Sequence, residues 1–239
     1  MADLDKLLKK SASIPLISVI VPIYNEERVV GQILRKLCLL KKQISMEIIA
    51  VDDGSVDRTS EVIKEFPSVR LVTHTENMGK GKAIITGLSK SRGNIVIIQD
   101  ADGEYAPEEI PKIIAPIVSG RADIVFGSRF MDITNGNGMS VSHRIANIVL
   151  SLVASLLYSV RITDIMTGHK AFSKQSIDSI DLSADGFEIE VEITGKLIQN
   201  GWRLLEVPIP YSRRQYGEAK ITAKDGLVCL TKLFSGIFY

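Results

Sequence analysis

Runs of aliphatic and β-branched residues alternate with amphipathic segments through the first half of the chain. The amphipathic segments have apolar residues at helical spacing, and the runs between them have the length of buried strands. This alternation predicts an α/β fold with a Rossmann-like, mostly parallel central sheet and helices on both faces. The predicted strands are 17–22, 47–51, 69–73, 95–99 and 124–127, and the predicted helices are 27–40, 57–66, 79–91 and 107–118.

The second half of the chain is less regular and contains two apolar segments. Residues 145–160 carry no charge but fall short of the ~20 residues that a membrane-spanning helix needs. We expect a helix there that either belongs to the core or lies at a membrane surface. Residues 222–239 predict an apolar C-terminal helix, which can lie flat on a bilayer. No repeat or linker divides the chain, so we expect one domain over residues 1–239, with 1–15 as a leader.

Composition and charge narrow the range of partners. The chain has 239 residues, of which 45% are hydrophobic, which is enough for one substantial core. Its 29 basic and 28 acidic residues nearly cancel, so no overall field attracts nucleic acid, and any recognition of anions must be local. Cys38 and Cys229 form no C-x-x-C pair, and we interpret both as core thiols of a cytoplasmic protein.

Polar side chains follow consecutive predicted strands at the points where the strands end. Tyr24 and Glu26 follow the first strand, Asp52 and Asp53 end the second, and further polar groups follow the third and fourth. Ligands of open α/β sheets bind beyond the carboxyl ends of the strands. We therefore expect these side chains to gather at one edge of the sheet.

Asp100 and Asp102 are the strongest chemical signal. The alternation of an extended chain places both carboxylates on one side, and Glu104 follows two residues later. Together they can bind one hard cation, Mg²⁺ or Mn²⁺, whose open positions accept the phosphate oxygens of a nucleotide. The alternative is that one of these acids caps the helix that begins near Pro107. One acid suffices for a cap, so the pair favours a metal site.

The other strand ends carry groups suited to a nucleotide. The ring of Tyr24 can stack on a base, and Glu26 and the acids near Asp53 can accept hydrogen bonds from its edge or from the ribose. Helix capping and turn formation are the alternatives for the same segments. The loop at 77–82 lacks the spacing of a P-loop, and no G-x-G-x-x-G follows a strand, so kinases and dinucleotide-dependent oxidoreductases are disfavoured.

Several cations are candidates for binding phosphate groups. Arg129 follows the fifth predicted strand, and Arg213, Arg214 and Lys220 lie in a loop that contains glycine. Arginine pairs well with phosphate oxygens. The alternative for the loop is a solvated basic surface.

In chain order, the motifs PIYNE, VDDGS, NMGKGKA, DADGEY, GSRF, DIMTGHKAF and RRQYGEAK resemble those of family 2 glycosyltransferases with the GT-A fold, most of all the dolichyl-phosphate mannose synthases. The resemblance covers about residues 17–220. It implies that Asp100, Asp102 and Arg129 are catalytic and that Asp100, Asp102 and Glu104 bind the metal, with Glu104 where the family often has Gln. It implies a nucleotide-sugar site formed by Pro22, Tyr24, Glu26, Val51, Asp53, Asp100, Ala101, Asp102, Arg129, Arg214 and Lys220.

The acceptor can be inferred from its acidity. A sugar hydroxyl needs a carboxylate base near pH 7, whereas a lipid phosphate, with a second pKa near ~6, is already ionised. The chain lacks the Q-x-x-R-W segment that accompanies the catalytic acid in many hydroxyl-glycosylating relatives, although Asp164, Glu188 and Glu190 can serve as acids. We therefore expect an inverting transfer of a hexose to dolichyl or polyprenyl phosphate, and the resemblance to the dolichyl-phosphate mannose synthases implies that the hexose is mannose from GDP-mannose.

The expected place of this reaction is the cytoplasmic face of a membrane. The apolar segment 145–160, preceded by His143 and Arg144, would guide the prenyl chain, and contact with the membrane is peripheral, made directly or through a membrane-anchored partner. Alternatives are a UDP-sugar-dependent transferase of glucose or GlcNAc to polyprenyl phosphate or a sugar hydroxyl, a non-catalytic nucleotide-sugar sensor, and a nucleotidyltransferase. The sequence leaves the oligomeric state open.

Overall fold

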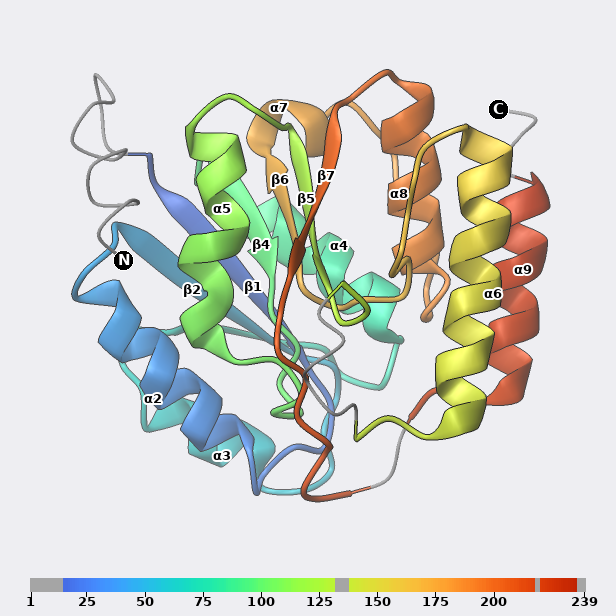
Figure 1. Cartoon of the computed structure of the whole chain (residues 1–239). Coiled ribbons are helices and arrows are strands. Elements are labelled where there is room, and N and C mark those ends of the chain that lie inside the picture. The colour runs from blue at the N-terminus through green and yellow to red at the C-terminus, as the bar shows by residue number, and fades with distance from the viewer. Residues whose placement is uncertain (1–14, 132–137, 218–219, 236–239) are drawn as a thin grey trace.

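A seven-stranded sheet with helices on both faces forms the centre of the computed structural model, which describes residues 15–131, 138–217 and 220–235 (Figure 1). The strand order is β3-β2-β1-β4-β6-β5-β7. Strand β6 is antiparallel to its neighbours β4 and β5, and all other pairs are parallel, which confirms the mostly parallel sheet. The strands are β1 (Ile17–Ile23), β2 (Met46–Asp52), β3 (Arg70–Thr73), β4 (Ile95–Ile98), β5 (Ile124–Ser128), β6 (Lys170–Ser173) and β7 (Leu204–Pro208).

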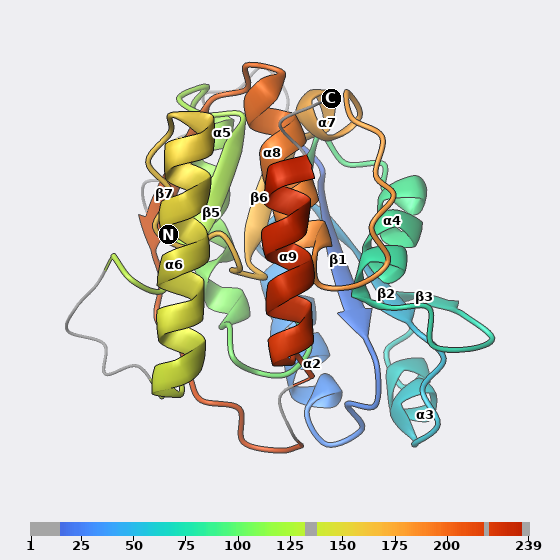
Figure 2. The ribbon, with the colours of Figure 1, turned by 90° about the vertical axis from the view of Figure 1, so that its right-hand side faces the viewer.

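The helices form one layer on each face of the sheet and a further outer layer. On one face lie α2 (Val30–Lys41), α3 (Thr59–Lys64), the 3-10 turn η1 (Pro107–Glu109) and α5 (Ile110–Val118). On the other lie α4 (Lys80–Lys90), α7 (Lys174–Ile177) and α8 (Ile189–Gln199). Helices α6 (Val141–Tyr158) and α9 (Ala223–Ser235) stand side by side outside α8 (Figure 2).

Strand β1 shows why the central strands are almost uniformly apolar. Val19 and Val21 pack with α2 and α5 on one face, whereas Ile20 packs with Ile84 and Ile189 on the other. A strand covered by helices on both faces loses the usual alternation of polar and apolar residues. The five strands and four helices predicted in the first half are all present, with ends that differ by at most three residues.

Strand β6 and helix α8 were not predicted because charged residues that form part of them are buried. Lys170 in β6 is fully buried and donates hydrogen bonds to Ile165 O (2.7 Å) and to Glu190 O (3.1 Å) and Oε2 (2.6 Å). Its ammonium also lies 4.7 Å from the centre of the Phe126 ring. A sequence pattern assigns such charges to the surface, although here they form an internal ion pair.

Helix α6 confirms the predicted helix at 145–160, and only one of its faces is buried. Of its residues, 22% are buried, and large apolar side chains such as Leu152 (57% exposed) and Leu156 (73%) face outward. Among the described residues it is the helix that is long and apolar enough to cross a membrane. Its inner face packs on α8 and α9, where Leu150 and Ala154 join a buried cluster, and contact of its outer face with a membrane stays a prediction. The predicted leader 1–15 and residues 236–239 of the predicted C-terminal helix lie almost entirely outside the described residues.

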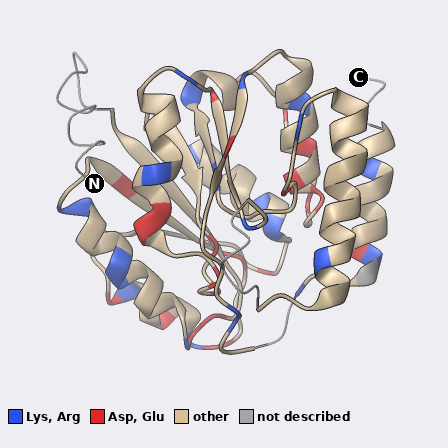
Figure 3. Ribbon diagram, in the orientation of Figure 1, with Lys and Arg blue, Asp and Glu red and all other residues tan. Residues whose placement is uncertain are grey.

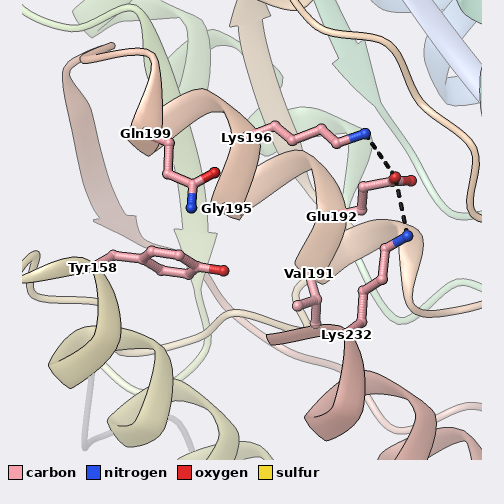
Figure 4. A pocket seen from close by; sticks show the side chains of 7 residues that line it. All are labelled: Tyr158, Val191, Glu192, Gly195, Lys196, Gln199 and Lys232. Atoms are coloured by element: carbon pink, nitrogen blue, oxygen red, sulfur yellow. Dashed lines mark hydrogen bonds and ion pairs between the residues drawn. The ribbon is translucent and has the colours of Figure 1, made fainter. Parts of the chain in front are cut away.

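An ion-pair cluster ties α9 to α8 (Figure 4). Glu192 of α8 lies 2.9 Å from Lys196 Nζ and 3.1 Å from Lys232 Nζ of α9. It also accepts hydrogen bonds from the amides of Ser183 and Ala184. The carboxylate therefore joins the outer helix to the segment before α8.

The buried pair of Lys170 and Glu190 gives a stability prediction. Lys170→Met removes one of the two cations that pair with the buried Glu190 carboxylate. We therefore expect the free energy of unfolding to fall by about 3 kcal/mol in urea titrations. Lys174→Met removes a partly exposed helical pair with Asp178, and its effect should stay below about 1 kcal/mol. Equal losses in the two variants would contradict the assigned role of Lys170.

Glu192 gives a pH prediction. Burial alone would raise the pKa of Glu192, but Lys196 and the amides of Ala184 and Ser183 outweigh burial and lower the pKa to about 2. A lowered pKa stabilises the fold above the ordinary value of 4.5, and this contribution is lost as the pH falls towards 2. We expect wild type to be more stable than Glu192→Gln at pH 6 and the difference to shrink as the pH falls below about 4. Glu65→Gln, at an exposed position, is the control variant. A difference between wild type and Glu192→Gln that stays constant as the pH falls would contradict the role assigned to Glu192.

Candidate active site

The loops that follow β1, β2 and β4 meet at one edge of the sheet, as predicted. The amide of Asn25 after β1 donates to Ser55 Oγ after β2 (2.9 Å). Arg214, which follows β7, forms an ion pair with Glu26 after β1 and lies 3.5 Å from Asp102 Oδ2 after β4. Segments far apart in the sequence therefore share one polar site.

The basic segment, defined as residues 213–220 without the undescribed 218 and 219, lies over the groups expected to bind the nucleotide. Arg214 and Lys220 both contact the carboxylate of Glu26, which is only 6% exposed, and the distance from Lys220 Nζ to Glu26 Oε1 is 2.6 Å. The Lys220 ammonium also lies 5.5 Å from the centre of the Tyr24 ring. The predicted phosphate-binding cations are thus paired with a predicted nucleotide-binding acid.

The three predicted metal ligands lie close together but do not surround a common point. The ammonium of Lys80 contacts both carboxylate oxygens of Asp100, at 2.8 and 3.1 Å. Asp102 Oδ1 accepts a hydrogen bond from the Glu104 amide (3.0 Å), and the Glu104 carboxylate bonds to Tyr211. Within the part of the chain that the structure describes, no three His, Cys, Asp or Glu side chains form a ready metal site. Each carboxylate is turned towards its own protein donor.

The charges of this acidic segment nevertheless fit a divalent cation. Burial raises the pKa of Asp100 to about 6, Lys80 opposes the rise, and the charge of Asp102 adds to it. Burial and the charge of Asp102 likewise raise the pKa of Glu104 to about 7. A divalent cation between these carboxylates would relieve their mutual repulsion. Their hard oxygen atoms are the ligands that Mg²⁺ and Mn²⁺ prefer.

Lys80 and Gly168 are parts of the site that the sequence analysis missed. Besides Asp100, Lys80 pairs with the buried Glu190, at 2.9 Å between Nζ and Oε1. Gly168 lies so close to Asp100 that a Cβ atom there would be 1.8 Å from Asp100 Oδ2. The sequence signal for Lys80 is its position in the loop after the third strand, where the ends of parallel strands bring polar groups together. Because this loop lacks the spacing of a P-loop, the sequence analysis assigned it no role.

Asp53 has a clear structural role beside its predicted one. Its carboxylate accepts hydrogen bonds from the amides of Met78 (3.0 Å) and Gly79 (2.8 Å), and it contacts His74 Nδ1 at 2.7 Å. The neighbouring Asp52 has a buried oxygen, Oδ2, without a partner among the described residues. Asp52 is therefore a further acceptor at this strand end.

The remaining predicted nucleotide residues present little side-chain surface. Val51 is fully buried and Ala101 is 3% exposed, so only their main chains are available to a nucleotide. Pro22, at the end of β1, is partly exposed. Their contacts with a nucleotide stay predictions.

Arg129 is buried and paired with an acid. It is 7% exposed, and its Nε and Nη2 atoms each lie 2.7 Å from the carboxylate of Asp164. Glu190 is similarly held by Lys170 and Lys80. The sequence left three acids for catalysis. Asp164 and Glu190 are engaged as counter-ions, whereas Glu188 accepts a hydrogen bond from the Gly186 amide (3.2 Å).

Comparison with known proteins identifies the family of this chain. Residues 18–180 match the model of glycosyl transferase family 2. The chain is 32% identical over 228 residues to the UDP-N-acetylglucosamine–dolichyl-phosphate N-acetylglucosaminyltransferase of Methanococcus voltae, covering 87% of this chain and 90% of that protein. It is 32% identical over 222 residues to the polyprenol monophosphomannose synthase of Mycolicibacterium smegmatis, covering 87% and 81%.

The fold is also found in a solved structure with little sequence similarity. Glucosyl-3-phosphoglycerate synthase from Mycobacterium tuberculosis, crystallised with Mn²⁺ and UDP-glucose, superposes with a TM-score of 0.77 at 18% identity, over 99% of this chain and 83% of that one. This likeness supports the GT-A fold. With the family model spanning most of the sheet and the site at its carboxyl edge, the chain belongs to glycosyl transferase family 2.

Proposed function

We propose that this protein is an inverting glycosyltransferase that transfers a hexose, mannose from GDP-mannose, to a polyprenyl (dolichyl-type) phosphate. The observation that carries the proposal is the group of carboxylates at the ends of β1 and β4 beneath the basic segment. Such a site has acceptors for a base and ribose, ligands for a cation and positive charges for a diphosphate. Of the two family relatives named above, one is by its name a dolichyl-phosphate N-acetylglucosaminyltransferase and the other a synthase of polyprenol monophosphomannose.

Donor binding would proceed by an exchange of ionic partners. Arg214 and Lys220 now neutralise Glu26, and a nucleoside diphosphate offers these cations stronger, more highly charged partners. Once the cations pair with the diphosphate, Glu26 is free to accept hydrogen bonds from the nucleotide, and the ring of Tyr24 is uncovered for stacking. Asp100, Asp102 and Glu104 would hold Mg²⁺ or Mn²⁺, which stabilises the negative charge of a leaving diphosphate.

The proposed reaction is a single displacement. An oxygen of the lipid phosphate forms a bond to the anomeric carbon while the bond from that carbon to the diphosphate oxygen breaks, which inverts the configuration. An ionised phosphate has no proton to lose, so no general base is required. The engagement of Asp164 and Glu190 in buried ion pairs supports an acceptor of this kind over a sugar hydroxyl.

The exposed faces of α6 and α9 suit a peripheral position on the cytoplasmic face of a membrane. Their outward apolar side chains are Ile145, Ile148, Val149, Leu152, Leu156, Leu227, Val228 and Phe234. Arg144 and Lys224 lie in the first turns of the two helices. Both helices begin at the end of the molecule where the active-site loops lie, and basic positions are seen at this end in Figure 3. An apolar surface bordered by cations fits a bilayer with anionic headgroups. It would hold the prenyl chain beside the donor site.

A donor panel with polyprenyl phosphate tests the catalytic proposal. With Mg²⁺ or Mn²⁺ present, we expect transfer from GDP-mannose, and Asp102→Ala should lower kcat at least about 100-fold because charge stabilisation of the leaving diphosphate is lost. The exposed Asp181→Ala is the matched control and should leave the rate unchanged. Transfer only from UDP-GlcNAc or UDP-glucose would contradict the proposal that GDP-mannose is the donor. A wild-type rate in Asp102→Ala, or no transfer from any donor, would contradict the proposed transferase activity.

Sedimentation with anionic liposomes tests the membrane proposal. Leu156→Glu places a charge in the apolar face of α6 and removes a side chain whose burial is worth about 1.5–3 kcal/mol, so we expect at least about tenfold weaker partitioning. Leu39→Glu is a control on α2, where the leucine is 53% exposed and far from α6. Unchanged partitioning of Leu156→Glu would contradict membrane docking. A change in self-association instead would assign the face to a second copy of the chain.

A further inference from the structure

The inner face of α6 carries a polar stripe that bonds to the segment before β6. Asn147, Ser151 and Ser155 are spaced by four residues and therefore share one face of the helix. Ser151 Oγ accepts a hydrogen bond from the Ile165 amide (3.0 Å). Ser155 Oγ accepts from the Ile162 amide and donates to the Ile162 carbonyl, both at 3.0 Å. An otherwise apolar helix is thus fixed to residues 162–165 along three turns.

Asn147 makes the bond of this stripe that leads to the active site. Its Nδ2 atom donates to Asp164 Oδ1 (2.8 Å), and its Oδ1 atom accepts from Ser151 Oγ (3.2 Å). Ser151 therefore sets the orientation of the amide, so that the NH₂ group faces the carboxylate. Asn147 is 5% exposed and Asp164 is fully buried, so water does not compete for this bond.

Asp164 in turn fixes Arg129 by a two-point pair. Both carboxylate oxygens accept from the guanidinium at 2.7 Å, and Asp164 Oδ2 also accepts from the Arg129 amide at 3.0 Å. The rings of Tyr105 and Tyr211 each lie 5.7 Å from the guanidinium carbon. This pair uses only one edge of the guanidinium, whose other N–H groups remain as donors. Burial would lower the pKa of Arg129, but Asp164 and the charge of Glu104 raise it, so the guanidinium stays charged beside the acidic segment.

We propose that Asn147 is a positioning residue, which through Asp164 holds the guanidinium of Arg129 with its free edge towards a phosphate group in the site. This inference rests on the proposed function of that site. Asn147 touches no substrate itself, because its amide is occupied by Asp164 and Ser151. It is on the same helix as the outward apolar face, so α6 joins the surface proposed to meet the lipid to the arginine proposed to meet the phosphate.

Solvent exchange of the Arg129 Nε–H group tests the positioning directly, without any activity. The resonance is assigned in the full chain from its absence in Arg129→Lys. In Asn147→Leu, which has a similar volume but no donor, we expect Nε–H exchange to be at least about tenfold faster than in wild type, because the pair with Asp164 loosens. Asn147→Ser is a second variant should the leucine prevent folding. Ser155→Ala removes bonds from the same stripe but none to Asp164, and its exchange rate should match wild type.

Steady-state kinetics identify the phosphate that Arg129 meets. We expect kcat/KM for polyprenyl phosphate to fall about tenfold in Asn147→Leu, with the KM for the nucleotide sugar within about twofold of wild type. A rise confined to the KM of the nucleotide sugar would assign the guanidinium to the diphosphate instead. Wild-type exchange in the Asn147 variants, or an equal effect in Ser155→Ala, would overturn the positioning role. A wild-type protein that transfers no sugar would overturn the proposed function, while the exchange rates still decide the role of Asn147.

Discussion

Carboxylates that are largely buried at the exits of β1 and β4 destabilise the fold unless positive charges lie beside them. The structure meets this constraint with cations from distant parts of the chain. Lys80 at the start of α4 neutralises Asp100, and Arg214 from beyond β7 neutralises Glu26 and approaches Asp102. The strand order places β1 beside β4, which is what brings these acids together. Cations that pair with these acids can also change partners and pair with the phosphate groups of a ligand.

The strands and helices of the first half could be predicted from the spacing of apolar residues, because packing between the sheet and the helices on its two faces requires apolar residues at those positions. The antiparallel strand β6 and helix α8 could not, since Lys170, Glu190 and Glu192 are buried there. The meeting of the polar side chains at one edge was also predictable, because parallel strands deliver their last residues to the same edge, and their roles in binding stay predictions. Their partners were not: Glu26 and Arg214 are 188 residues apart, and only the folded chain shows that they meet.

Two features of the site depend on tertiary contacts that no local pattern reveals. Arg129 was predicted as a phosphate-binding cation, yet its guanidinium is held by Asp164, and Asp164 is held by α6. Helix α6 was ambiguous in the sequence because its apolar outer face and polar inner stripe are interleaved at helical spacing. The stripe acquires meaning only when residues 162–165 are seen against it. The same helix therefore combines an apolar exterior with an internal hydrogen-bond network.

The comparisons place a varied chemistry on a common scaffold. Relatives of equal identity carry names with different sugars, and a solved structure at 18% identity keeps the fold. The sheet fixes where the acids and cations stand, and the side chains around the sugar and base select the substrate.

Calorimetric titration of GDP measures the binding of a diphosphate by the acidic segment separately from any transfer reaction. We predict that GDP binds wild type tightly only with Mg²⁺ or Mn²⁺, and that Asp100→Asn removes this dependence on the cation. Equal affinity with and without the cation, in wild type and variant alike, would contradict it.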